Sequence, residues 1–89
     1  MPEIPQLIVY TLEYCPNCEI LKGFLKTGGY AFLERDLSTA ESLTELRMNG
    51  VFVSEAPVLQ VNEDFFTSAD LFPAGKLDGA QLTKLIKGE

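Results

Sequence analysis

The segment TLEYCPNCEILKGFL, residues 11–25, holds both cysteines of the chain and decides how the surrounding sequence is interpreted. It begins at the end of an apolar, β-branched run and continues into residues with helical spacing. Two thiols, Cys15 and Cys18, therefore lie at a strand-to-helix junction, three positions apart. Such a pair can be a structural disulfide, part of a metal site or a reactive centre.

Strands and helices alternate outward from this junction. The preceding run, residues 6–12, is short and continuously apolar, as is typical of a buried strand. Lys22 and Lys26 are expected on the outer face of the first helix, which ends at Gly28-Gly29. Its inner face is predicted from apolar residues at helical spacing: Ile20, Leu21, Phe24 and Leu25.

The rest of the chain continues this pattern. Further strands are expected at residues 30–37, at 57–61 and from Phe65, with a polar turn at 62–64. Helix N-caps are expected at Ser38, which has the capping-box spacing to Glu41, at Ser68 and at Asp78.

The predicted order is β-α-β-α-β-β-α, an α/β fold in a single domain over residues 1–89. Crossover helices join the first strands, so those strands should pair in parallel, and the late hairpin should add an antiparallel strand. The expected result is a four-stranded mixed sheet flanked by helices.

Charge and composition narrow the function classes. The net charge is −6, and the seven basic residues are scattered, so no basic face is available for nucleic acid or an anionic membrane. Residues 1–6, MPEIPQ, lack the basic cluster and apolar run of a signal peptide, and no stretch approaches the roughly 18–20 apolar residues of a membrane span. We therefore expect a cytoplasmic protein, in which a close cysteine pair is more often catalytic or metal-binding than structural.

The junction predicts a reactive geometry for the cysteines. With Cys15 as helix N-cap, Pro16 takes the first helical position, where its missing N–H is no loss, and Cys18 takes the third. The Cys15 sulfur can then accept hydrogen bonds from the N–H groups of Asn17 and Cys18, and the helix dipole favours negative charge there. Both effects stabilise the thiolate, which is the nucleophile. Cys18, one turn inside, suits the resolving attack on a mixed disulfide.

Two other interpretations stay open. A disulfide that closes a loop of three residues removes little entropy from the unfolded chain, so a structural disulfide here would stabilise the fold only weakly. Zinc and iron–sulfur sites also use C-x-x-C but normally need four ligands. With no histidine and no third cysteine, a metal would have to bridge two chains or recruit external thiols, and no Cys-His catalytic pair is possible.

Two segments give the chain a family resemblance: VYTLEYCPNC at residues 9–18 and EAPVLQV at 55–61. With the predicted element order, they make it similar to glutaredoxin-type members of the thioredoxin-fold superfamily. The resemblance implies that fold over essentially the whole chain. It also implies a cis peptide bond between Ala56 and Pro57, close to the cysteines, with the preceding backbone exposed to a substrate chain.

Several positions depart from the pattern common among glutathione-dependent members. Leu12 occupies the position of a lysine, and Asn17 that of an aromatic residue. Glu55-Ala56-Pro57 replaces threonine-valine-proline, and Thr67-Ser68-Ala69-Asp70 replaces a glycine pair followed by acidic residues. Glutathione carries two carboxylates, so a site that lacks this lysine and has Glu13, Glu19 and Glu55 nearby should hold it poorly. Lys22 is the only nearby cation by sequence. We therefore expect a redoxin that is recharged by a reductase of the thioredoxin-reductase type.

The sequence thus predicts a small dithiol–disulfide oxidoreductase that reduces protein disulfides, with Cys15 and Cys18 as catalytic residues. The resemblance suggests ribonucleotide reductase as one client. No cofactor is expected, and the chain is expected to be monomeric. The candidate substrate-binding residues are Tyr14, Pro16, Ala56 and Pro57.

The alternative is a metal-binding or cluster-delivery protein that uses the same cysteines in a dimer. Pro16 disfavours it by resemblance, because cluster-binding relatives often have glycine there. A third possibility is a partner-binding scaffold whose cysteines are incidental.

Overall fold

The computed structural model describes residues 6–52 and 55–87. The expectation about a signal peptide, and the ends of the predicted domain, lie largely outside these residues. The strands are β1 (Leu7–Thr11), β2 (Leu33–Asp36), β3 (Val58–Val61) and β4 (Asp64–Phe66). The helices are α1 (Pro16–Thr27), α2 (Ala40–Met48), α3 (Ser68–Leu71) and α4 (Gly79–Lys87), with a 3₁₀ turn, η1, at Pro73–Gly75. This is the predicted order, with the short α3 and η1 before the last helix.

The four strands form one mixed sheet in the order β2-β1-β3-β4. β1 and β2 are parallel, as expected for strands joined by the crossover helix α1. β3 does not continue this arrangement: it runs antiparallel to β1, on the side away from β2. The expectation that the first strands all pair in parallel was therefore wrong for β3, because the connection through α2 reverses the chain direction. β4 is the antiparallel hairpin strand, as predicted.

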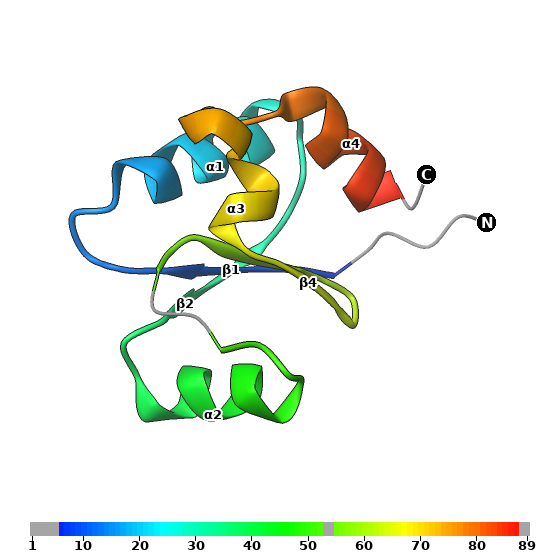
Figure 1. The fold of residues 1–89 in the computed structure, drawn as a ribbon. Coiled ribbons are helices and arrows are strands. Elements are labelled where there is room, and N and C mark those ends of the chain that lie inside the picture. Colours follow the sequence, from blue (N-terminus) through cyan, green and yellow to red (C-terminus); the bar gives the residue numbers. More distant parts are fainter. Residues whose placement is uncertain (1–5, 53–54, 88–89) are drawn as a thin grey trace.

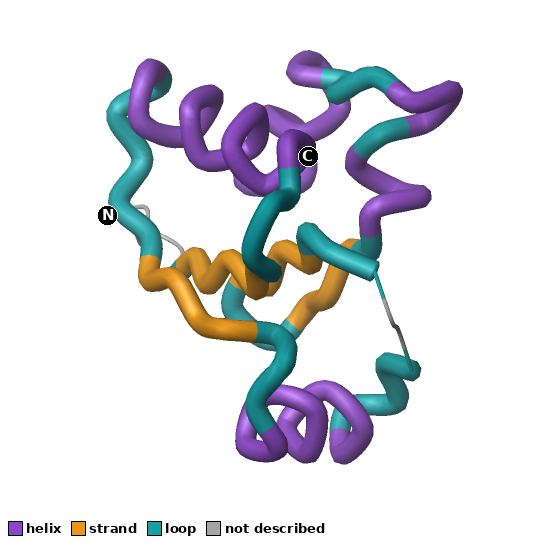
Figure 2. Tube along the Cα trace, turned by 90° about the vertical axis from the view of Figure 1, so that its left-hand side faces the viewer, coloured by secondary structure: helices purple, strands orange, loops and turns teal. Residues whose placement is uncertain are grey.

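Helices cover both faces of the sheet (Figure 1). α1, α3 and α4 lie on one face, and α2 lies alone on the other. Figure 2 shows the same three layers after a quarter turn, with the strands between the two groups of helices. The architecture is the α/β thioredoxin fold predicted from the sequence.

Each face of the sheet has its own apolar core. The first core packs β1 and β3 against the three helices, with Val9, Leu21 and Leu59 fully buried. The second lies under α2 and contains Tyr10, Leu46 and Val58. Because β1 contributes to both cores, all five of its residues are buried, as expected for a strand without apolar–polar alternation.

Two helix starts differ from the predicted N-caps by one residue. α2 is capped by Thr39, whose Oγ1 accepts a hydrogen bond from the Ser42 N–H at 3.1 Å. Ser38 instead donates its own N–H and hydroxyl to Asp36, which leaves the cap to its neighbour. Similarly, Thr67 and not Ser68 precedes α3. Asp78 does cap α4, accepting from the Gln81 N–H at 3.0 Å.

The inner face of α1 also differs from the expectation. Cys18, Leu21 and Leu25 are buried, whereas Ile20 is 50% exposed. Lys22, expected on the outer face, lies against the sheet, with only 14% of its side chain exposed. The apolar pairs at residues 20–21 and 24–25 are compatible with two helix faces about 100° apart. The buried face is the one that contains Cys18, Leu21 and Leu25.

Candidate active site

The cysteine pair lies where β1 leads into α1. Cys15 is the N-cap of α1, with extended backbone, and its sulfur accepts a hydrogen bond from the Cys18 N–H at 3.1 Å. Pro16 is the first helical residue. This is the predicted cap and first helical residue, although the sulfur accepts from the Cys18 N–H and not from both predicted donors. The cap follows from sequence neighbours, because a proline that starts the helix leaves the preceding residue as its cap.

The two cysteines form a disulfide, with their Cα atoms 5.2 Å apart. Their environments differ, because Cys15 is half-buried whereas Cys18 is 1% exposed. Cys15 is thus the more accessible of the two cysteines, and its sulfur is bonded to that of Cys18. The arrangement can exchange its disulfide with a dithiol partner through Cys15.

Tyr14 immediately precedes Cys15 and is 98% exposed. Its φ is 55°, in the left-handed region that non-glycine residues seldom adopt. The loop therefore holds a large aromatic side chain outside the fold, directly beside the accessible sulfur. This fits the predicted position at the rim of the site, and it does not fit an aromatic residue that covers the sheet edge.

Pro57 lies next to the same end of β1. The Ala56–Pro57 peptide bond is cis, as the resemblance implied, and Pro57 is buried while Ala56 is half-buried. Val58, the next residue, pairs with Tyr10 of β1. The start of β3 is thereby brought alongside the strand end from which the cysteine loop departs.

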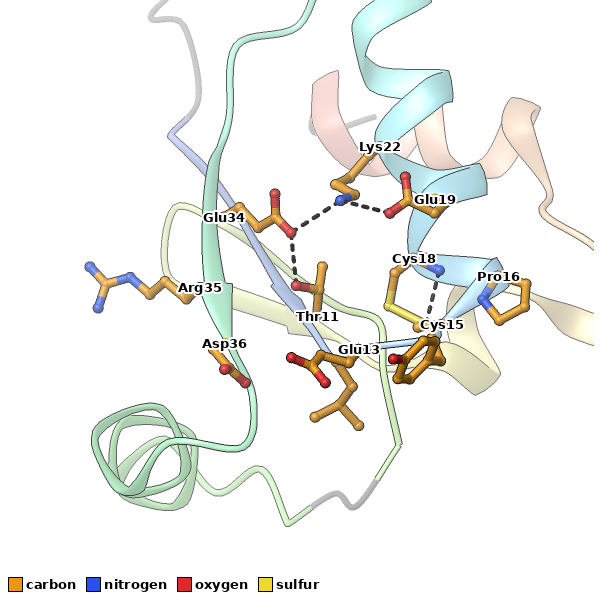
Figure 3. A pocket seen from close by; sticks show the side chains of 12 residues that line it. Thr11, Glu13, Cys15, Pro16, Cys18, Glu19, Lys22, Glu34, Arg35 and Asp36 are labelled. Atoms are coloured by element: carbon orange, nitrogen blue, oxygen red, sulfur yellow. Dashed lines mark hydrogen bonds and ion pairs between the residues drawn. A yellow bond between two sulfur atoms is a disulfide. The ribbon is translucent and has the colours of Figure 1, made fainter.

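A pocket of about 670 Å³ opens on the other flank of the cysteines, between α1 and β2. It is lined by the end of β1, the cysteine loop, the first turns of α1 and the last three residues of β2 (Figure 3). Inside it, Lys22 Nζ lies 3.1 Å from both Glu19 Oε1 and Glu34 Oε2. Glu34 Oε2 also accepts a hydrogen bond from Thr11 Oγ1 at 2.9 Å.

This network fixes the charges of its members. The hydrogen bonds to Glu19 and then Glu34 raise the pKa of Lys22 above its ordinary value. The hydrogen bonds from Lys22 and Thr11 lower the pKa of Glu34. An ammonium group and a carboxylate therefore both persist through the neutral range beside the cysteine pair.

Comparison with known proteins places the chain in a family. A family model described as glutaredoxin matches residues 7–66, more than half of the chain. The chain belongs to the glutaredoxin family. No curated protein sequence matches this glutaredoxin-family chain significantly.

A solved structure gives the same fold. It is NrdH-redoxin from Escherichia coli, described as a glutaredoxin-like protein with a thioredoxin-like activity profile. It superimposes with a TM-score of 0.66 and 17% identity, over 90% of this chain and 93% of that one. Together the family and the fold make this chain a glutaredoxin-like redox protein with a cysteine pair near its N-terminus.

Sequence reasoning missed the β2 side of the site in this glutaredoxin-family protein. Four residues that line the pocket were not predicted as site residues: three from β2, namely Glu34, Arg35 and Asp36, and Thr11 at the end of β1. The signal was available: β1 and β2 were expected to be parallel, so their carboxyl ends meet at one edge, where Thr11 pairs with Asp36. The Arg35 side chain points away from the cysteines, whereas the Lys22 ammonium group points toward Glu34 and Glu19 (Figure 3).

Two negative findings concern the described part of the chain. In residues 6–52 and 55–87, no group of three or more His, Cys, Asp or Glu side chains could hold a metal ion. Within the same ranges, no helix combines the length and apolar character required to cross a membrane.

Proposed function

We propose that this chain is a dithiol–disulfide oxidoreductase that reduces protein disulfides through Cys15-Pro16-Asn17-Cys18. The observation that carries the proposal is the hydrogen bond from the Cys18 N–H to the Cys15 sulfur at the N-terminus of α1. That donor and the helix dipole both stabilise a Cys15 thiolate in the reduced protein. The nucleophile thus forms at the sulfur that a partner can reach.

The reaction is a two-step exchange. The Cys15 thiolate attacks a substrate disulfide, forms a mixed disulfide and releases one substrate sulfur, which takes a proton from water. The Cys18 thiolate then attacks the Cys15 sulfur, closes the Cys15–Cys18 bond and releases the second substrate sulfur. Two electrons pass to the substrate, and the protein becomes the disulfide form.

The substrate segment is proposed to bind across Tyr14, Pro16, Ala56 and Pro57. Tyr14 offers an exposed aromatic surface beside the reacting sulfur, and Pro16 is exposed on the helix start. On the other side, an extended substrate chain could hydrogen-bond to the Ala56 backbone in the manner of an added strand. Ribonucleotide reductase, the client class that the family resemblance suggests, remains one candidate substrate.

The proposed reductant is an enzyme of the thioredoxin-reductase type. Leu12, which stands where many glutathione-dependent relatives have lysine, is half-buried against the apolar core under α2. Lys22 is already engaged by two carboxylates. Glutathione, with its own two carboxylates, therefore meets several acidic side chains in this pocket, where Lys22 is paired and the Arg35 side chain points away from the cysteines. The thioredoxin-like activity profile of NrdH-redoxin supports the same choice.

The test compares two reductants of the oxidised protein. One sample receives glutathione, the other receives NADPH and thioredoxin reductase, and protein thiols are counted over time. We expect rapid reduction by the enzyme and slow, incomplete reduction by glutathione. Equilibration with glutathione alone as fast as with the reductase would overturn the proposed reductant.

A further inference from the structure

The proposed reaction requires a thiolate at a buried position. Cys18 is 1% exposed, and burial disfavours the charged form of a thiol relative to the neutral form. Its sulfur is not the N-cap acceptor, since Cys15 holds that place. A further source of positive charge near Cys18 would allow it to ionise and complete the exchange.

Lys22 is four residues after Cys18 in α1, and residues so spaced lie on the same face with Cβ atoms about 5–6 Å apart. A lysine on a helix ordinarily extends its ammonium into water. Here the side chain is 14% exposed and lines the same pocket as Cys18, with Nζ held at 3.1 Å by carboxylates from two elements (Figure 3). The charge is thus fixed in place before a substrate arrives.

We propose that Lys22 is a positioning residue that holds a positive charge one turn beyond Cys18 and so stabilises the Cys18 thiolate that resolves the mixed disulfide. The proposal rests on the proposed exchange reaction. Glu19 and Glu34 orient the ammonium group, and Thr11 orients Glu34.

Glu34 is the competing candidate, as a base that would take the Cys18 proton. The same hydrogen bonds that hold Lys22 lower the pKa of Glu34, which makes this carboxylate a poor proton acceptor. The Cys18 proton therefore leaves to water in the open pocket. The electron pair that remains on Cys18 forms the Cys15–Cys18 bond, the bond from Cys15 to the substrate breaks, and the departing substrate sulfur takes a proton from water.

Other charges around the pocket limit the size of the effect. They come from every element that lines it: Glu13 from the loop, Glu19 from α1, and Glu34, Arg35 and Asp36 from β2. The carboxylates oppose the thiolate, and Arg35 points away. A nearby opposite charge lowers the pKa of an acid by roughly one to three units. Because two carboxylates already pair with Lys22, we expect a shift of no more than about one unit in the pKa of Cys18.

The test measures the Cys18 pKa directly in a Cys15→Ser background, from the ¹³Cβ chemical shift during a pH titration. Lys22→Gln keeps hydrogen-bond donors for both carboxylates but removes the charge. We expect it to raise the Cys18 pKa by about one unit, a roughly tenfold loss of thiolate at neutral pH. Lys22→Arg should restore the value, and Lys84→Met, an equal loss of charge on α4, should leave it unchanged. Lys22→Met serves as a second neutral variant if the first does not fold.

Kinetics give a second measure. A thiolate of higher pKa is also a stronger nucleophile, with a Brønsted slope of about 0.4–0.5, so a tenfold loss of thiolate should slow substrate release about three- to fourfold. In a Cys18→Ser background, Lys22→Gln should shift the Cys15 pKa by less than it shifts the Cys18 pKa in the Cys15→Ser background. The proposal fails if a folded Lys22→Gln protein keeps the wild-type Cys18 pKa, or if both cysteines shift equally. Either result leaves the proposed reaction intact, whereas persistent disulfide reduction by Cys15→Ser would overturn the reaction itself.

Discussion

Lys22 Nζ lies 3.1 Å from Glu34 Oε2, so an ion pair ties α1 to the edge strand β2 at the end of the sheet that carries the cysteines. The two residues are twelve positions apart in the sequence and meet only because β2 lies parallel to β1. Glu34 has 47% of its side chain exposed, so the pair sits at the mouth of the pocket and is partly screened by water.

Glu34→Gln should lower the free energy of unfolding by about 0.5–1 kcal/mol at neutral pH, the range of partly exposed ion pairs. The folded state lowers the pKa of Glu34 below 4.5, so this stability is present above that pH and is lost as the pH falls through the folded pKa. The folded state raises the pKa of Lys22 above 10.5, so the Lys22 part is lost only as the pH rises through that higher value. Urea titrations from about pH 3 to 8 should therefore show the wild-type advantage disappear at the acid end.

The matched control is Glu63→Gln, which removes an exposed carboxylate in the turn between β3 and β4. It should show no comparable loss of stability at neutral pH. An advantage of wild type over Glu34→Gln that grows toward acid pH would contradict the assigned direction of the shift.

Cys15→Ser should abolish turnover of a protein disulfide, whereas Cys18→Ser should accumulate a mixed disulfide between Cys15 and the substrate. Serine is a good N-cap, so the first variant keeps the helix start and tests chemistry alone. Intact-mass spectrometry without reductant would detect the adduct, and a thiol assay would follow turnover. Residual turnover by Cys15→Ser would assign the reaction to another group.

Tyr14→Ala should leave the free energy of unfolding unchanged within about 0.5 kcal/mol, because the side chain is 98% exposed. The KM for a protein disulfide should rise about 5- to 30-fold, as expected when an interface tyrosine worth 1–2 kcal/mol is truncated. A small disulfide that does not reach the side chain should react as before. Phe52→Ala, at a 78% exposed residue outside the pocket lining, is the control and should not change the KM.

Leu21→Ala should destabilise the protein by about 2–5 kcal/mol, because Leu21 is fully buried between α1 and the sheet. Ile20→Ala, the adjacent change on the same helix, should cost less than about 1 kcal/mol because Ile20 is 50% exposed. Chemical denaturation of both variants measures the difference. Equal losses would mean that α1 presents a different face to the sheet.

Local features of the site were predictable from the sequence. The order Cys15-Pro16 fixes the cap and the first helical residue within two positions, and the glycines after Thr27 end the helix as expected. Such features depend on neighbours in the chain, so a single sequence contains the necessary information. The Ala56–Pro57 cis bond was reached only through family resemblance, since the local sequence does not distinguish it from a trans bond.

The missed features depend on which elements meet in space. Lys22 was expected on the outer face because charged residues are usually solvated. Its ion pair with Glu34 of β2 accounts for its position against the sheet, and that pair cannot be seen from the helix sequence alone. The direction of β3 likewise depends on tertiary packing. β3 pairs with β1 on the side away from β2, and a helical connection to that position can produce either a parallel or an antiparallel strand. The position of Lys22 and the direction of β3 are set by packing between distant segments, so the hydrophobic periodicity of the sequence does not predict them.

The cysteine loop is attached to β1, which pairs with β2 on one side and β3 on the other and is buried along its whole length. Amides in such a strand exchange with solvent mainly when the whole molecule unfolds. Oxidation and reduction of the cysteine pair therefore act on the loop and the first turn of α1, while β1 behind them stays paired. A redox protein with this layout can pass through many cycles without unfolding the sheet that holds its cysteines.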